Sequence, residues 1–278
     1  MMLNTFRVRK TKNIVAITLM GVTATLACIP IFLILFKCLE LGLPAMTLQF
    51  FTELPKPAGE SGGGLAHSIL GTLTIVTLTT IASVPVAVIL GLLTSEFPKR
   101  KTARLASLSL DVLSAIPSIL IGVFIYEFAV VAMGGFSMLA GVAALALIFI
   151  PIMAKSSHEI FSLVPREIRE SGMALGLSRS RVLVSILLIG VRGGLLRSAL
   201  LCIARVSGES APLLFTALNA NYFGTSLFRP VSTLPVQIYT FAQTPFPAWQ
   251  EAAWAGALVL IGISLSIQVM VRVVGSKV

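Results

Sequence analysis

Long apolar runs alternate with short polar segments along most of the chain. A helix needs about 20 mostly apolar residues to cross the hydrocarbon core of a bilayer. Because six runs approach or exceed this length, the pattern predicts an all-α polytopic membrane protein with six transmembrane helices. The predicted spans cover residues of about 14–36, 68–93, 105–132, 136–154, 194–217 and 252–271.

The first apolar run follows basic residues and contains Leu26-Ala27-Cys28, a pattern that also occurs in lipoprotein signal peptides. The run continues through residues 29–36 and is long enough to span a bilayer, so we expect a retained first helix. We divide the chain into residues 1–60, with the N-terminal tail, first helix and external loop, and residues 61–274, the main transmembrane domain.

Four prolines lie inside predicted spans: Pro30, Pro85, Pro117 and Pro151. Each removes a backbone donor, so we expect each to bend its helix. Membrane helices tolerate such prolines where neighbouring helices or water satisfy the freed carbonyls.

The composition agrees with a chain solvated by lipid, since 56% of the residues are apolar and only 12% are charged. A soluble domain would carry roughly a quarter charged residues. The net charge of +10 raises nucleic-acid binding as an alternative, and the distribution of the charges decides between the two interpretations.

The basic residues gather on alternate polar segments. One set comprises Arg7, Arg9, Lys10, Lys12, Lys99, Arg100, Lys101, Arg104, Lys155, Arg166, Arg169, Arg179, Arg181, Arg272 and Lys277. The opposite segments carry only Lys37, Lys56 and Arg229. This is the positive-inside pattern, and it predicts that both termini are cytoplasmic. The charge is thereby explained by topology, and no nucleic-acid partner is expected.

The external segments 37–67 and 218–249 differ from the cytoplasmic ones in being rich in glycine, proline or aromatic residues. Aromatic side chains there are suited either to docking of a partner or to an aromatic belt at the lipid headgroups. The three cysteines, Cys28, Cys38 and Cys202, have no metal-type or paired spacing, so we expect no metal site, disulfide framework or cofactor.

The loop between the fourth and fifth predicted spans carries the signals of a short cytoplasmic helix. Pro165 suits the first turn of a helix, and Glu170 lies toward the N-terminal half, where the helix dipole favours acidic residues. Gly176 is placed to end the helix in the left-handed conformation, and Ser178 is placed to cap a second helix. The loop therefore predicts a helix, a sharp turn and a second helix that re-enters the membrane.

Small residues, Ser171, Gly172 and Ala174, follow Glu170 on this helix. Small side chains let another backbone approach closely, which favours docking into a groove of a soluble partner. An ordinary helix–turn–helix connection would carry the same capping signals, so both interpretations stay open.

Arg205 and Glu209 lie within the fifth predicted span. If Gly193-Gly194 breaks the re-entering helix, Arg205 lies roughly 16 Å into the span at about 1.5 Å per residue. A buried arginine faces a cavity or a partner charge, and Glu209, four residues later, would share its helix face. The pair either neutralises itself or contacts a transported oxyanion, whose oxygens match guanidinium donors.

Other polar residues carry weaker signals. Asp111 and Glu127 lie in the third predicted span, and we expect water or the headgroups around Glu96, His67 and His158. An intramembrane enzyme would need a catalytic pair, for which Asp111 and Glu127 are the carboxylate candidates. There is no phosphate-binding loop, because the glycines at 62–64 lack the following Lys, so the sequence offers no site for ATP hydrolysis.

The cytoplasmic loop resembles the Glu-Ala-Ala loop of the membrane subunits of type I ABC importers. Glu170-Ser171-Gly172 and Gly176 match the motif, and Ile186 and Leu188 match its Ile-x-Leu-Pro end, with Ile189 in place of the proline. The resemblance implies a type I ABC importer permease fold in which Pro165, Glu170, Ser171, Gly172, Ala174 and Gly176 form a coupling helix against an ATPase.

Within that family, residues of about 60–274 are similar to the A-type membrane subunits of bacterial phosphate importers. The matching segments are 63–64, 71–73, 111–119, 122–124, 163–165, 174–176 and 204–214, with Ser210 where a Thr is usual. The resemblance implies a permease subunit that moves inorganic phosphate across the cell inner membrane, with Arg205 and Glu209 on the substrate pathway. It also implies an ABC ATPase dimer, a homologous second permease subunit and an extracytoplasmic phosphate-binding protein. A sulfate or molybdate importer is the alternative.

Overall fold

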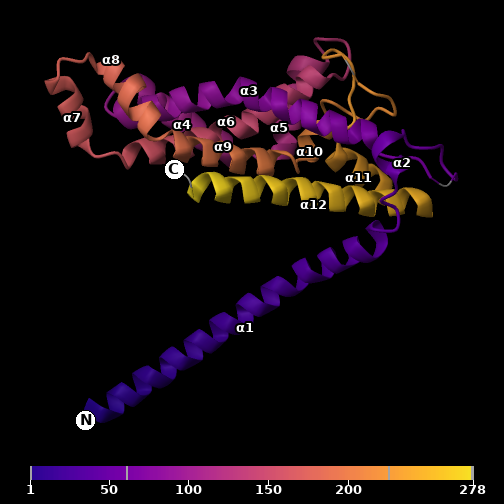
Figure 1. Ribbon diagram of the computed structural model, residues 1–278, viewed down its shortest axis with the longest axis horizontal. Helices are drawn as coiled ribbons and strands as arrows, with labels where there is room; N and C mark the ends of the chain where they lie inside the picture. The colour runs from indigo at the N-terminus through magenta and orange to yellow at the C-terminus, as the bar shows by residue number, and fades with distance from the viewer. Residues whose placement is uncertain (1, 61, 225, 277–278) are drawn as a thin grey trace.

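A computed structural model describes residues 2–60, 62–224 and 226–276, so Lys277 and the first residue of the predicted 61–274 domain lie outside the described residues (Figure 1). The described part of the chain is helical and contains no β-strand, only an isolated bridge between Pro55 and Gly63. The longest helices are α1 (Met2–Gly42), α3 (Ala66–Glu96), α6 (Met138–Ser162) and α12 (Pro247–Ser276), and α9 (Arg192–Val206) is of intermediate length. The shorter elements are α2 (Leu48–Thr52), α4 (Lys101–Ala115), α5 (Ser118–Ile125), the π-helix η1 (Tyr126–Val130), α7 (Arg166–Ala174), α8 (Arg179–Arg181), the π-helix η2 (Val182–Leu188), α10 (Ala211–Leu214) and α11 (Leu234–Ala242).

Four of the described helices are long and apolar enough to cross a membrane, and the number becomes six if each of two bent helix pairs counts as one span. The single helices are Arg9–Gly42, Ala66–Glu96, Met138–Ser162 and Pro247–Val273. They contain the predicted spans 14–36, 68–93 and 252–271 and most of 136–154. The all-α polytopic architecture is confirmed, while the third and fifth predicted spans need correction.

The third predicted span is not one straight helix. Its two arms, Lys101–Ala115 and Ser118–Val130, are bent by 104° relative to each other. The residue before a proline is disfavoured in helical conformation, and Ile116 accordingly has an extended backbone with ψ 128°. Of the four prolines expected to bend helices, Pro117 lies at this break, while α1, α3 and α6 each continue through theirs.

The fifth predicted span is wrong at both ends. The re-entering pair Arg179–Leu188 and Arg192–Val206 is bent by 66° around Gly190 and Val191. The expected break at Gly193-Gly194 does not occur, because both glycines lie inside α9. The helix then ends at Val206 rather than continuing to residue 217.

Helix α6 is the centre of the bundle. It packs along α3 and against α4, α5 and α9, and α9 in turn packs on α12 (Figure 1). The two helices approach closely at Gly91, where an added Cβ would lie 2.4 Å from the Cβ of Ser157. The lack of a side chain on Gly91 permits this approach. The apolar core between these helices includes the buried side chains of Ile75, Leu145, Phe149 and Met153.

A second, smaller core joins α2, α11 and the start of α12 at the end of the bundle opposite α7. Phe50, Leu65 and Leu234 are buried there. His67 lies beside this core with only 2% of its surface exposed, and its Nε2 lies 3.1 Å from the Ser68 Oγ. The expectation that His67 is interfacial is therefore wrong, because its side chain is buried next to Ser68, whose Oγ lies 2.7 Å from the Ser232 Oγ.

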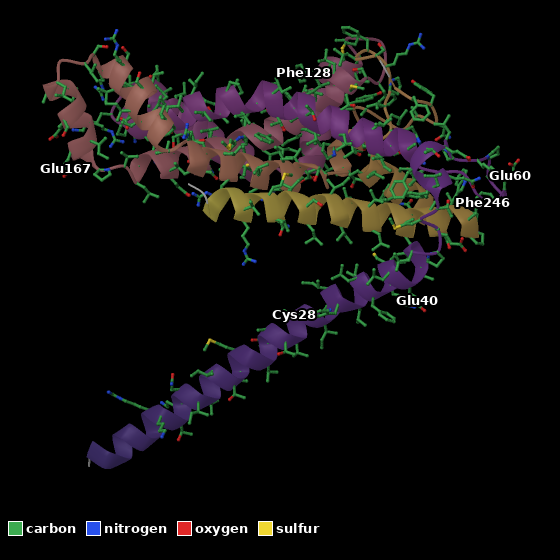
Figure 2. The ribbon with its side chains drawn as sticks, viewed as in Figure 1. Cys28, Glu40, Glu60, Phe128, Glu167 and Phe246 are labelled. Atoms are coloured by element: carbon green, nitrogen blue, oxygen red, sulfur yellow. The ribbon has the colours of Figure 1, made fainter. Side chains whose placement is uncertain are left out.

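Helix α1 diverges from the bundle and contacts it only near its own C-terminal end (Figure 1). Gly42 approaches the backbone of Trp254 and the side chain of Leu258 on α12. The most apolar window of α1 has no buried residue, and side chains such as Cys28 project from it without a neighbour from the bundle (Figure 2).

Candidate functional site

A polar cavity of about 260 Å³ lies where the α4–α5 bend faces α6 and the end of α9. Its walls bring together residues from three separate stretches of the chain. They are Leu113, Ser114, Ile116, Pro117, Ser118, Ile121, Ile148, Pro151, Ile152, Arg205 and Glu209. The two residues that the sequence singled out as pathway candidates therefore line one cavity, together with two serines.

The bend at Pro117 supplies one wall of this cavity. Helix α5 begins at Ser118, which lines the cavity, so the first N–H groups of α5 lie at that wall. The first N–H groups of a helix have no intrahelical acceptor, and the N-terminal end of the helix dipole favours anions. Sequence reasoning did not identify this feature, although the Pro117-Ser118 pair after an apolar helix was a readable signal for it.

Arg205 reaches the cavity from the last turn of α9. The sequence predicted that Glu209 would share a helix face with Arg205, and this prediction is wrong. Helix α9 ends at Val206, and Ser207-Gly208 form a turn in which the Glu209 N–H donates to the Val206 carbonyl. Among the described residues, the ion pairs within 4 Å do not include one between Arg205 and Glu209. The two charges therefore face the same cavity without neutralising each other by direct contact.

The position of Glu209 depends on a close contact between α5 and α10. A Cβ on Gly122 would lie 2.7 Å from the Cα of Pro212. Only glycine leaves room for α10 to lie against α5 at this point. Glu209 lies two residues before α10, so this contact holds the segment that carries it beside α5.

The predicted cytoplasmic helix is present as α7, followed by a turn at Gly176 with φ +83°. Two details differ from the prediction. Pro165 is the residue before the helix, with ψ 145°, rather than part of its first turn. Ser178 precedes α8, but its side chain bonds to the Ser180 Oγ and caps no backbone N–H.

Gly172 is buried against the chain's own re-entering helix. A Cβ there would lie 2.9 Å from both the Ile186 Cδ1 and the Val182 Cγ2. Its small size is therefore required by packing within this chain, whereas Ser171 and Ala174 are exposed on the outer surface of α7.

The outer surface of α7 and its flanks carries exposed apolar side chains among charged ones. Leu163 and Leu175 are each 82% exposed, and Ile168 and Met173 are close to half exposed. These side chains lie on α7 or next to it in sequence. Figure 2 shows α7, marked by Glu167, at the end of the bundle opposite Glu60 and Phe246. Exposed apolar side chains gathered at a surface are typical of an interaction site.

Arg169 fastens α7 to the end of α3. Its Nε and Nη2 both donate to Oε1 of Glu96, and it also donates to the carbonyls of Phe161, Val164 and Pro165. Only 6% of the Glu96 side chain is exposed, so the expectation that Glu96 meets water is wrong. The partners are 73 residues apart in sequence, and no local pattern could have paired them.

The remaining polar candidates lie elsewhere. Asp111 forms an ion pair with Lys155 at 2.8 Å, and both line a cavity of about 230 Å³ that also includes His158. The His158 Nδ1 lies 3.0 Å from the Thr94 Oγ1, so this histidine joins α6 to α3 rather than facing only the headgroups. Glu127 is exposed on η1, across the 104° bend from Asp111. Within the described ranges, no group of three His, Cys, Asp or Glu side chains could hold a metal ion.

Comparison with known families gives a match over residues 83–278, more than half of the chain. The matching family is described as "Binding-protein-dependent transport system inner membrane component".

Curated relatives extend the match to nearly the whole chain. The "Phosphate transport system permease protein PstA" of Yersinia pestis is 37% identical over 270 residues, covering 97% of this chain and 92% of that protein. The protein of the same name in Pasteurella multocida is 36% identical, covering 96% of each.

Solved structures show the fold. The inward-facing MetNI methionine ABC transporter matches with a TM-score of 0.64 at 18% identity, covering 77% of this chain and 96% of that one. An amino acid ABC transporter with histidines matches with a TM-score of 0.56 at 14% identity, covering 76% of this chain and 92% of that one. The type I ABC importer permease fold predicted from the loop motif is thus confirmed.

Proposed function

The chain belongs to the family of binding-protein-dependent transport system inner membrane components, and we propose that it is the permease subunit of an ATP-driven importer of inorganic phosphate. It is a multi-pass protein of the inner membrane. In this proposal residues 61–274 are the permease domain, residues 1–60 add the first helix and external loop, and ATP is hydrolysed on a separate chain.

The observation that carries the proposal is the cavity that Arg205 and Glu209 share with the N-terminal end of α5. A guanidinium group and helix N–H groups are both suited to the oxygens of a phosphate ion. Glu209 adds a negative charge to the same wall, which weakens the hold on the anion. A transport pathway needs such weak binding, because an anion that binds too tightly cannot leave.

The coupling to ATP hydrolysis would act at α7. An ABC ATPase dimer would cover the exposed apolar side chains around α7, with Pro165, Glu170, Ser171, Ala174 and Gly176 at or beside the contact. Gly172 instead maintains the packing of α7 on the re-entering helix. Because Arg169 ties α7 to the end of α3, a movement of α7 would be passed to the α3–α6 pair.

Two further partners fit surfaces that this chain leaves uncovered. A homologous second permease subunit would face the side of the cavity that exposes Arg205 and would complete the pathway. An extracytoplasmic phosphate-binding protein would dock at the opposite end from α7, where Tyr222, Phe223 and Phe228 are exposed. The rest of the apolar surface would meet the lipid bilayer.

The topology in this proposal places α7 and both termini in the cytoplasm. The alternation of basic segments favours it. The first turns of α1 and the last turns of α12 also lie toward the end of the molecule that carries α7 (Figure 1).

Uptake by the reconstituted assembly tests this function. The permease pair, ATPase and binding protein in proteoliposomes should take up radiolabelled phosphate in an ATP-dependent manner, with sulfate and molybdate as weak competitors. Preference for sulfate or molybdate would replace phosphate with the alternative oxyanion, and turnover of a lipid or peptide by the chain without ATP would support an intramembrane enzyme instead.

A further inference from the structure

A second and larger cavity, of about 590 Å³, lies beside α7 at the end of the bundle away from Glu60 and Phe246. Its lining comes from the end of α3 and the loop that follows, from the end of α6, from α7 and from α8. The lining residues are Ser95, Glu96, Phe97, Pro98, Lys99, Arg100, Ser162, Val164, Arg166, Arg169, Glu170, Met173 and Arg179. This cavity is separate from the one that contains Arg205.

The charges around this cavity are unbalanced. Five of the lining residues are basic, and two, Glu96 and Glu170, are acidic. Glu96 is matched by Arg169. The ion pairs among the described residues include none for Lys99, Arg100, Arg166 or Arg179. Four cationic side chains therefore face one cavity with only the exposed Glu170 to oppose them, and the cavity favours an anion.

Two of the guanidinium groups are held in place by an aromatic ring. The central carbon of Arg100 lies 4.6 Å from the ring centroid of Phe97, and that of Arg179 lies 4.4 Å from it. Arg179 also donates to the Glu96 carbonyl at 3.2 Å. Stacking on an aromatic face restrains a guanidinium group and leaves N–H donors at its edge. Such restrained forks bind tetrahedral oxyanions with less loss of side-chain entropy than mobile lysines do.

We propose that this cavity binds a phosphate group, through Arg166 of α7, Arg179 of α8 and Arg100 of the loop after α3. Under the topology described above it opens to the cytoplasm, where two sources supply that chemistry: free inorganic phosphate and the headgroup of an anionic phospholipid. In either case the bound anion bridges α7 to the loop after α3, next to the Arg169–Glu96 contact, and it restrains the movement of α7.

Binding to the full-length chain in lipid nanodiscs tests the proposal without requiring transport. An Arg205→Gln background removes the guanidinium from the other cavity. One arm measures radiolabelled inorganic phosphate binding in phosphatidylcholine nanodiscs, and the second measures phosphatidylglycerol retained by the chain in native mass spectrometry. Arg166→Gln is the main variant, because Arg166 is exposed and α7 packs without its side chain. Arg181→Gln is the matched control, being exposed on the same α8 as Arg179 but absent from the lining.

We expect saturable binding in at least one arm, weakened about tenfold by Arg166→Gln, as for the loss of one charged hydrogen bond. Arg181→Gln should leave binding unchanged. The arm that responds identifies the source of the phosphate group. Equal binding by both variants, or no binding in either arm, overturns the proposal. So does an Arg166→Gln chain that keeps its anion binding but loses association with the ATPase, because the cavity would then be a protein contact.

Discussion

Removal of Arg169 should release α7 from the bundle, and removal of Glu96 should do so much less. Arg169→Gln leaves the nearly buried Glu96 carboxylate without its partner and deprives three backbone carbonyls of a donor. Breaking a buried ion pair from one side costs about 3–5 kcal/mol. Glu96→Gln keeps an oxygen acceptor at the same place and leaves the three carbonyls bonded to Arg169, so its cost should be about 1 kcal/mol.

Hydrogen exchange of the α7 backbone amides measures this difference directly, since exchange there reports the free energy of local opening. At about 1.4 kcal/mol per factor of ten, protection should fall more than a hundredfold in Arg169→Gln and about fivefold in Glu96→Gln. Asp111→Asn is the control. It breaks an ion pair whose side chains are about half exposed, which contributes about 1 kcal/mol or less, and it should leave α7 unchanged.

The structure requires a larger loss of protection in Arg169→Gln than in Glu96→Gln. Equal loss of protection in Arg169→Gln and Glu96→Gln would mean that the carbonyl contacts contribute nothing. Unchanged protection in both variants would refute the inference that Arg169 holds α7 against the end of α3. A charge exchange, Glu96→Arg with Arg169→Glu, should not restore protection, because a carboxylate at 169 cannot donate to the carbonyls of Phe161, Val164 and Pro165.

Three further predictions concern other parts of the fold. Gly91→Ala should lower the free energy of unfolding of the purified protein by about 1–3 kcal/mol through overpacking against Ser157. The control Gly21→Ala, where an added Cβ has nothing within 4 Å, should not lower it. Equal thermal melting curves for the two variants would contradict the close approach of α3 and α6. Gly176→Ala should weaken the turn after α7 by about 1–2 kcal/mol because of its positive φ, and Gly176→Asn should cost less in the same hydrogen-exchange measurement. In reconstituted assemblies Arg205→Gln should lower phosphate uptake about tenfold or more, and an Arg192→Gln control on the same helix should not; wild-type uptake by Arg205→Gln would remove it from the pathway.

Features set by a single run of residues were predictable from the sequence. The positions of α1, α3, α6 and α12 were expected, because an apolar run long enough for a bilayer is a local property, although α1 begins 12 residues before its predicted span and α6 ends eight residues after its own. The turn at Gly176 was also predictable, since the left-handed conformation is readily adopted by glycine.

Features that depend on distant contacts were not predictable. His67 is buried beside Ser68, which contacts Ser232 more than 150 residues later in the chain, and the burial of Glu96 depends on Arg169. Gly172 was interpreted as part of a possible partner contact, but a neighbouring helix of the same chain requires it.

The relation between Arg205 and Glu209 was misjudged for a local reason. Ser207-Gly208 marks a helix end, yet the apolar run continues past it to residue 217. Hydropathy alone therefore extended a helix that the backbone ends at Val206. Glu209 nevertheless lines the same cavity as Arg205.

The isolation of α1 has a consequence for biosynthesis. Because the apolar window of α1 is not buried by the rest of the chain and has a mean hydropathy of 2.4, its entry into the bilayer draws on its own partitioning and not on packing with later helices. We therefore expect α1 to insert without the rest of the bundle, and Gly42 marks where the membrane-anchored helix first packs on α12.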